Sequence, residues 1–164
     1  MVDVRQLNEG ELDLYRSTRL AALKDAPYAF GSSYERESVF TQEKWLERAT
    51  SGWEGKSGIC IVALEEEHGV GLAGGVTNPS NPRIGHLVSM WVHEDHRGTD
   101  VASRLVAQVE VWAFDRGFET LCLGVTENND RAKRFYVNLG YTDYDGCPED
   151  EDCLIVLHKP LSIA

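Results

Sequence analysis

The sequence predicts an α/β protein of the mixed α+β kind, in which helices cover both faces of a mixed sheet. Short apolar runs typical of strands alternate along the chain with segments whose apolar residues recur at helical spacing. Helices inserted between strands pack onto either face of the sheet that those strands form. The 164 residues, 42% of them hydrophobic and 26% charged, suit one domain with a real core, spanning 1–164.

The first half of the chain contains signals for a strand, two helices and a hairpin. The predicted elements are a strand at 2–7, a helix from Leu12 that ends at Pro27, a helix at 41–49, and strands at 59–64 and 70–77. Thr41 is a suitable N-cap for the second helix because its hydroxyl can accept from a free amide of the first turn. Gly69 supplies the freedom needed in the turn between the paired strands. Residues 26–38 read as irregular.

The second half continues the same alternation. We expect a loop at 78–83, a strand at 84–92, a charged loop at 93–99, a helix at 100–115, a strand at 120–125, a helix at 130–139, a short strand at 141–144 and a last strand at 153–158. The helix at 100–115 has the clearest apolar stripe, through Val101, Leu105, Val109 and Trp112. Gly140 is the expected residue after the end of the following helix.

The charge balance excludes some partners. Sixteen basic and 27 acidic residues leave a net charge of −11, which disfavours a general binder of nucleic acid phosphates. No apolar run is long enough for a membrane span. The opening residues carry acids where a signal peptide has a basic start, so we expect a cytoplasmic protein. The acidity indicates either a solvated surface or an attraction for a cationic partner.

Cysteine and histidine patterns give no sign of a metal. Cys60 and Cys122 lie in apolar runs, where a reduced thiol behaves as a small hydrophobe. Cys147 and Cys153 flank an acidic loop and are expected to be reduced as well. The pair His93 and His96 lacks the further ligands of a zinc site. We therefore expect no metal.

One strand-loop-helix segment is suited to binding an anion. The strand that ends at Val92 is followed by HEDHRGTDVASRLV, which places Arg97 and Gly98 just before the start of a helix. Free amides and the helix dipole meet at such a point. The spacing of a G-x-G-x-x-G loop and of a P-loop is absent, which disfavours those nucleotide sites.

A second segment, TENNDRAKRFYVNLGYTDYD, is open to two interpretations from its residues alone. Asn129 is suited to capping a helix, and Phe135 with Leu139 to packing in a core. Tyr136 lies beside them, where a phenol serves either as a packing residue or as a proton donor.

Together the two segments resemble the GNAT superfamily of N-acetyltransferases, of the bacterial type. Residues 97–102 (RGTDVA) resemble its acyl-CoA pyrophosphate motif Q/R-x-x-G-x-G/A, and residues 129–141 resemble N-x-x-A-x-x-F-Y-x-x-L-G-F/Y. The resemblance extends over nearly the whole chain. It implies a central, mostly antiparallel sheet of six to seven strands with about four helices. It also implies acetyl-CoA as acyl donor, a small-molecule or peptide amine as acceptor, and a possible homodimer.

The resemblance assigns cofactor contacts residue by residue. The pantetheine arm is expected along Met90, Trp91 and Val92, like an added strand. The pyrophosphate is expected at Arg97, Gly98, Thr99, Asp100, Val101, Ala102 and Ser103, with Arg104 as a further positive charge. Asn129 matches the Asn that contacts the pantetheine arm, and Tyr136 matches the Tyr placed near the thioester sulfur.

The same resemblance implies direct attack of a neutral amine on the thioester, which requires a base. Tyr136 is the candidate for protonating the leaving thiolate. Many related proteins carry Glu at position 86, where this chain has His86, whose ordinary pKa suits proton abstraction at neutral pH. A strand-end histidine facing solvent is the alternative. Glu35 and Glu37 are other candidates for the base, and Ser89 for orienting a water.

One residue departs from the motif, because Asp100 replaces its glycine. An acid there adds bulk and a charge like that of the diphosphate, or it turns outward and stabilises the helix start. The departure supports a rival function, a non-catalytic module that binds acyl-CoA or nothing. The binding site for the acceptor is expected to be shaped by residues 26–38, 78–83 and 147–153.

Overall fold

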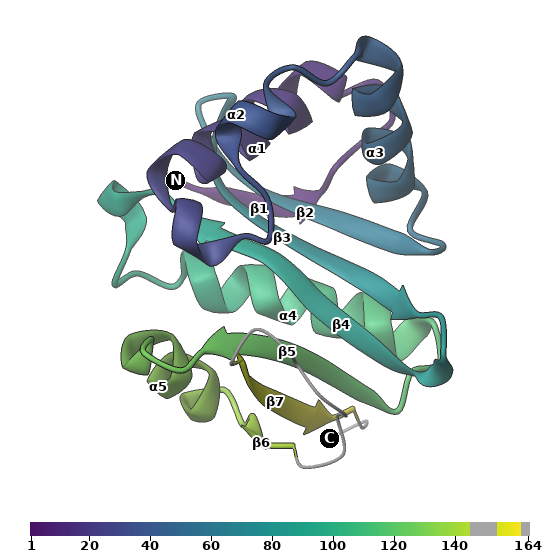
Figure 1. Ribbon diagram of the computed structural model, residues 1–164, viewed down its shortest axis with the longest axis vertical. Coiled ribbons are helices and arrows are strands. Elements are labelled where there is room, and N and C mark those ends of the chain that lie inside the picture. Colours follow the sequence, from purple (N-terminus) through teal and green to yellow (C-terminus); the bar gives the residue numbers. More distant parts are fainter. Residues whose placement is uncertain (145–153, 162–164) are drawn as a thin grey trace.

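The computed structural model describes residues 1–144 and 154–161 and confirms the mixed α/β fold (Figure 1). The elements in order are β1 (Asp3–Gln6), α1 (Leu12–Asp25), the 3₁₀ turn η1 (Pro27–Ala29), α2 (Tyr34–Glu37), α3 (Gln42–Glu54), β2 (Gly58–Glu65), β3 (His68–Asn78), β4 (Asn81–Val92), the 3₁₀ turn η2 (Glu94–His96), α4 (Val101–Asp115), β5 (Thr120–Thr126), α5 (Asp130–Asn138), β6 (Thr142–Asp143) and β7 (Leu154–Pro160). Cys147, Cys153 and the acidic loop between them lie outside the described residues. No helix in the described ranges has both the length and the apolarity needed to cross a membrane.

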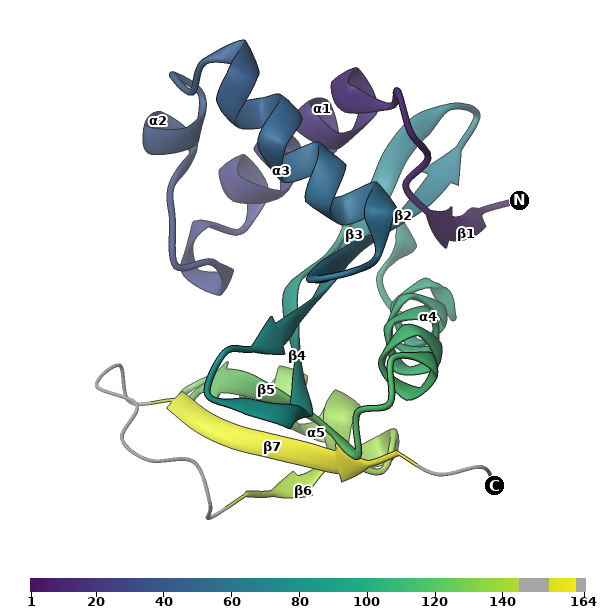
Figure 2. The ribbon, with the colours of Figure 1, turned by 90° about the vertical axis from the view of Figure 1, so that its right-hand side faces the viewer.

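The strands form one seven-stranded sheet in the order β1-β2-β3-β4-β5-β7-β6. Every neighbouring pair is antiparallel except β4 and β5, which are parallel. That parallel contact is short, because only residues 84–86 of β4 pair with residues 120–122 of β5. Beyond it the two strands diverge, as Figure 2 shows. The sheet therefore opens in its middle.

Helices cover both faces, as the sequence predicts. Along β2, Ile59, Ile61 and Ala63 belong to the core cluster formed with α4, while Cys60, Val62 and Leu64 belong to the cluster formed with α1 and α3. This alternation follows from the two-residue period of a strand. Because both faces are covered, β2 is buried along almost its whole length. The prediction that Cys60 lies in a buried strand is confirmed.

The helix starts use the side chains that the sequence suggests. The Thr41 hydroxyl accepts from the Lys44 amide at 3.2 Å, which confirms the predicted cap of α3. That helix runs five residues past the predicted end and finishes before Gly55, whose φ of +69° suits a residue without a side chain. Asn129 caps α5 by accepting from the Ala132 amide at 3.1 Å.

Two expectations for irregular segments were wrong. Residues 78–83 form a tight turn between two long strands, because Asn78 and Asn81 accept from the amides of Ser80 and Arg83 and so satisfy the turn locally. Residues 26–38 contain the short helix α2, which begins because the Ser33 hydroxyl accepts from the Arg36 amide.

Candidate active site

The free edge of β4 is the central feature of the site. After residue 86, β4 pairs only with β3 within the described chain, so one edge of residues 87–92 has no strand beside it. Residues 88 and 91 pair with Gly74 and Leu72, which leaves Ser89 and Met90 opposite the single residue Ala73. This is a β-bulge, and Ser89 adopts a positive φ of 57° within it. The bulge turns the strand at the point where the sheet opens.

The predicted pantetheine contacts lie on this edge. The side chain of Trp91 is buried against α1, and its indole N–H donates to Asp25 Oδ2 at 2.9 Å. Met90 packs at the border of the cluster beneath α4, and Val92 is buried within it. The side chains are therefore used for packing, and what residues 90–92 offer at the free edge is backbone.

The loop and helix start that follow offer a group of amides. Within the described chain, the amides of residues 98–100, 102 and 103 donate no hydrogen bond, and the Val101 amide donates to the Thr99 hydroxyl at a long 3.4 Å. Gly98 has a φ of +79°, which a residue without Cβ adopts easily. The Thr99 and Ser103 hydroxyls donate to the carbonyls of His96 and Asp100. Free amides at the N-terminus of a 15-residue helix fit a diphosphate.

The structure places the Arg97 side chain away from these amides. Its Nε donates to the Val92 carbonyl at 3.0 Å, and its Nη2 donates to Asp25 Oδ2 at 2.6 Å. Hydrogen bonding from the Trp91 indole, with the charge of Arg97, lowers the pKa of Asp25. Arg97 thus ties the end of α1 to the end of β4, and its Nη1 is left for a ligand.

Asp100 faces outward. Its side chain is 75% exposed, lies 3.9 Å from Arg104 Nη1 and makes no capping hydrogen bond. Its φ of −81° shows that the loop does not need a glycine conformation at this position. Arg104 also donates to the Val2 carbonyl at 3.1 Å, so it is anchored to the start of the chain.

Tyr136 lies on the β5 side of the opening. It is 7% exposed, with ring centroids 5.0 Å from Phe135 and 5.8 Å from Tyr141. Its hydroxyl makes no hydrogen bond to the described chain, and burial raises its pKa, so it is protonated at neutral pH. Asn129, which precedes the same helix, uses its carbonyl oxygen as the cap and keeps its amide N–H groups available.

His86 is the last residue of β4 that pairs with β5. Burial lowers the pKa of its half-buried ring, which is therefore neutral at pH 7. Asn78 lies 3.1 Å from Nε2, and because its carbonyl oxygen accepts from Ser80, its amide N–H faces the ring. Nε2 is then the acceptor and Nδ1 carries the proton. The lone pair that a base needs is engaged with Asn78.

Of the other base candidates, Glu37 is not suited to the role. Its carboxylate is 1% exposed and accepts from Arg19 on both oxygens, at 3.0 and 2.9 Å, and from Arg48 at 2.8 Å. Burial alone would raise its pKa, but hydrogen bonds from Arg19 and Ser32 and the nearby arginine charges lower it to about 2. A carboxylate held this firmly as an anion is a weak base. Glu35 is exposed on the neighbouring surface.

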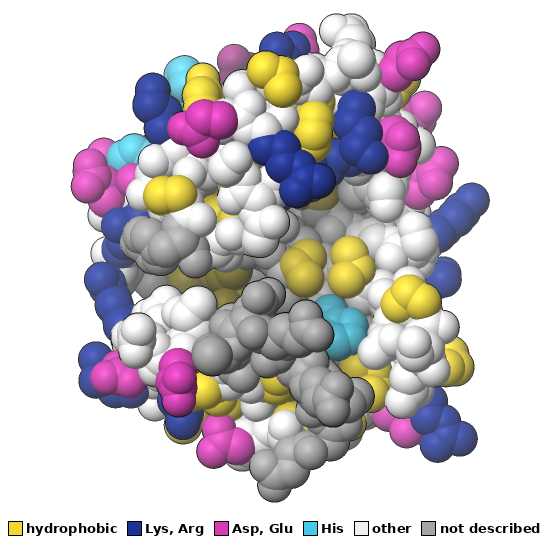
Figure 3. Space-filling view, in the orientation of Figure 1, with side chains coloured by type: hydrophobic (Ala, Val, Ile, Leu, Met, Phe, Trp, Pro, Cys, Tyr) yellow, Lys and Arg dark blue, Asp and Glu magenta, His cyan; other side chains and the backbone are white. Residues whose placement is uncertain are grey.

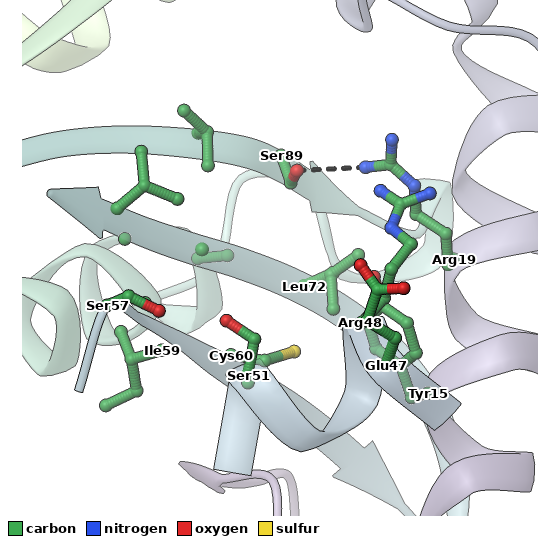
Figure 4. A pocket seen from close by; sticks show the side chains of 17 residues that line it. Tyr15, Arg19, Glu47, Arg48, Ser51, Ser57, Ile59, Cys60, Leu72 and Ser89 are labelled. Atoms are coloured by element: carbon green, nitrogen blue, oxygen red, sulfur yellow. Dashed lines mark hydrogen bonds between the residues drawn. The ribbon is translucent and has the colours of Figure 1, made fainter. Parts of the chain in front are cut away.

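Sequence reasoning missed the arginines beside Glu37. Arg19 is 6% exposed, and its Nη1 donates to the Ser89 hydroxyl at 2.9 Å, which connects α1 to the bulge (Figure 4). A signal was present, because Arg19 falls among the apolar positions of α1 and Arg48 follows Trp45 on the inner face of α3. An arginine on a buried stripe requires an acid partner.

The sequence predicts no metal and predicts acetyl-CoA as the acyl donor. His93 accepts from the Asp95 amide and His96 lies 2.9 Å from Glu65, and the described residues contain no group of three possible metal ligands. The free edge of β4 and the amides of 98–103 supply the donors that a pantetheine arm and a diphosphate would need.

Comparison with known proteins gives one family. The model of the acetyltransferase (GNAT) family matches residues 18–141. A GNAT acetyltransferase from Staphylococcus aureus superposes with a TM-score of 0.74 at 14% identity, over 99% of this chain and 100% of its own. PaiA N-acetyltransferase from Thermoplasma acidophilum, solved with coenzyme A, gives 0.74 at 15% identity, over 98% and 99%. An acetyltransferase from Streptococcus pneumoniae gives 0.78 at 16%, over 99% and 100%. Among curated proteins no match was found.

Proposed function

This chain belongs to the GNAT acetyltransferase family and is an acyltransferase, and we propose that it moves an acetyl group from acetyl-CoA to a primary amine by direct attack. The observation that carries the proposal is the opening of the sheet after His86. It leaves the edge of β4 free beside a helix start where the amides of residues 98–100, 102 and 103 have no partner within the described chain. Extended pantetheine and charged diphosphate need those two kinds of donor.

The side chain of Tyr136 is suited to act as the acid in this reaction. The amine nitrogen forms a bond to the acetyl carbon, the carbon–sulfur bond breaks, and the thiolate takes a proton. The hydroxyl of Tyr136, a residue that is 7% exposed, holds its proton at neutral pH and has no partner in the described chain. Backbone amides along 90–92 are suited to hold the charge that develops on the acetyl oxygen.

His86 remains our proposal for the base, with a condition. The neutral ring has the right protonation state, but Nε2 accepts from Asn78. To take a proton from the amine, directly or through a water, Nε2 must exchange this bond for one to the acceptor. Until the acceptor binds, Asn78 then occupies the lone pair of the base and fixes the tautomer of His86.

Thiol release from acetyl-CoA across a panel of amines tests the proposed function. We expect amine-dependent release by the wild type, and a loss of about 100-fold in kcat for His86→Ala. The low-pH limb of kcat should lie below pH 6.5 because burial lowers the pKa of His86. Calorimetry with acetyl-CoA distinguishes the acetyltransferase from the rival function, a non-catalytic module. Binding without release for any amine would favour a non-catalytic module, and absence of binding would contradict both.

A further inference from the structure

A cavity of about 470 Å³ lies on the face of the sheet opposite α4, between α1, α3 and strands β2, β3 and β4. Its size suits a small molecule. Figure 4 shows Arg19, Arg48 and Tyr15 at one end of the cavity, with Ser89 of the bulge beside Arg19. The surface is hollowed across the middle, and Lys and Arg side chains gather on one rim of the hollow (Figure 3).

The two arginines of this cavity have more donors than the chain uses. Each guanidinium carries five N–H groups. Arg19 spends three of them on Glu37 and Ser89. Arg48 spends one on Glu37, and its other four have no hydrogen-bond partner within the described chain. The Arg48 side chain is 28% exposed and lines the cavity.

The charges around the cavity do not balance. Arg19 and Arg48 supply two positive charges, and Glu37 supplies one negative charge. Glu47 also lines the cavity, but its side chain is 73% exposed and lies 3.6 Å from the ammonium of Lys44, which offsets it. One positive charge is left at the wall. The planar fork of N–H groups on a guanidinium matches the two oxygens of a carboxylate.

We propose that the acceptor amine also carries a carboxylate, as an amino acid does, and that Arg48 binds that carboxylate. This rests on the proposed function, since it names the substrate class of the same site. A single surplus positive charge fits one carboxylate better than a phosphate monoester, which carries nearly two negative charges. The hydroxyl of Tyr15, a buried residue that also lines the cavity, offers a further donor. The chain as a whole is acidic, which favours a cationic acceptor, but the wall of this cavity carries a surplus positive charge.

The position of the arginines also orients the acceptor. Arg48 and Arg19 share Glu37 Oε1, at 2.8 and 3.0 Å, and Arg19 reaches Ser89 of the bulge. A carboxylate on Arg48 therefore lies on the helix side of the cavity, and the rest of a small acceptor extends toward β4. That arrangement directs its amine to the strand whose free edge is proposed to hold the thioester.

Matched pairs of acceptors test the proposal. Each proteinogenic amino acid is compared with its carboxamide, which keeps the amine and removes the negative charge. We expect the wild type to favour the acid in kcat/KM. Arg48→Gln should lower the ratio of kcat/KM for the acid to that for the amide by about 10- to 100-fold, and this ratio, taken within one variant, does not depend on how much of the variant is folded. Arg16→Gln removes the same charge from an exposed position of α1, outside the residues that line the cavity, and should preserve the preference. Arg48→Lys, which keeps the charge but loses the fork, should retain part of it.

Binding separates failure of this proposal from failure of the proposed function. Calorimetry with N-acetylated amino acids and their amides requires no turnover. Transfer to amines without any preference for a carboxylate would overturn the inference and leave the acetyltransferase function standing. Binding of the acids that Arg48→Gln abolishes, without transfer to any amine, would support the carboxylate site and contradict the function. Neither binding nor transfer would overturn both.

Discussion

The two sides of β4 are built from different groups. On the side of α1 and α3, the cavity rests on buried charges, since Arg19 is 6% exposed and Glu37 1%. On the other side, past the free edge of β4, the groups that face solvent are backbone amides and exposed charges. The side chain of Asp100, for example, is 75% exposed. One region holds its geometry through side-chain ion pairs, and the other through the path of the main chain.

This difference has a consequence for what each region tolerates. A buried ion cluster fails when one member is removed, because the remaining charges lose their partners away from water. The ability of amides at a helix start to bind an anion depends little on which side chains surround them. Substitutions beside the cavity should therefore affect folding, and substitutions beside the loop should affect ligand affinity or rate.

Glu37→Gln should have the largest effect. It leaves Arg19 and Arg48 without the carboxylate that all three of their short contacts share. We expect unfolding in urea to show a loss of about 3–5 kcal/mol, the usual range for breaking a buried pair. Glu35→Gln, two residues away on the same short helix and exposed, is the control and should change stability by less than about 0.5 kcal/mol. Equal effects would contradict a special role for the cluster.

The same carboxylate should give stability a pH dependence at the acid end. The pKa of Glu37 is about 2 in the fold and 4.5 when unperturbed, so the fold is stabilised by the ionised form. This contribution is complete above about pH 4.5 and is lost as the pH falls toward 2. The stability difference between wild type and Glu37→Gln should narrow across that window in urea titrations. A difference that stays constant with pH would contradict the assignment.

Tyr136→Phe tests the opposite region, where the fold should be tolerant and the chemistry should not. The hydroxyl has no hydrogen bond to the described chain, so its removal should leave stability and acetyl-CoA affinity nearly unchanged. We expect kcat to fall about 10- to 100-fold, as for loss of a general acid. Tyr141→Phe is the matched control, because its hydroxyl donates to Glu110 at 3.0 Å. It should cost stability and spare kcat, and full turnover by Tyr136→Phe would remove that residue from the mechanism.

The contrast also explains what the sequence could predict. The strand order along the chain, the cap at Thr41 and the capping use of Asn129 follow from local patterns and are all present. The opening of the sheet depends on where β4 stops pairing with β5, and no local pattern marks that residue. The anion-binding loop could be found because its donors are consecutive in the chain.

The cavity could not be found in that way. Arg19, Glu37 and Arg48 come from three helices, and only the tertiary fold brings them together. The same holds for the contact of Arg97 with Asp25, 72 positions apart, which occupies part of a side chain expected to meet the diphosphate. The contact between Asn78 and His86 joins neighbouring strands across the turn that was expected to be a loop.

Asp100→Gly should have the smallest effect, and it measures how far the loop depends on side chains. Because the carboxylate is 75% exposed and lies near Arg104, its repulsion of a diphosphate is screened. We expect acetyl-CoA affinity to rise by no more than about fivefold, or about 1 kcal/mol. Asp100→Asn keeps the size and removes the charge, so equal gains for Asn and Gly in calorimetry would assign the penalty to charge. A gain for Gly alone would assign it to bulk. A much larger gain for either variant would mean that Asp100 turns toward the ligand, and the loop would then depend on its side chains as strongly as the cavity does.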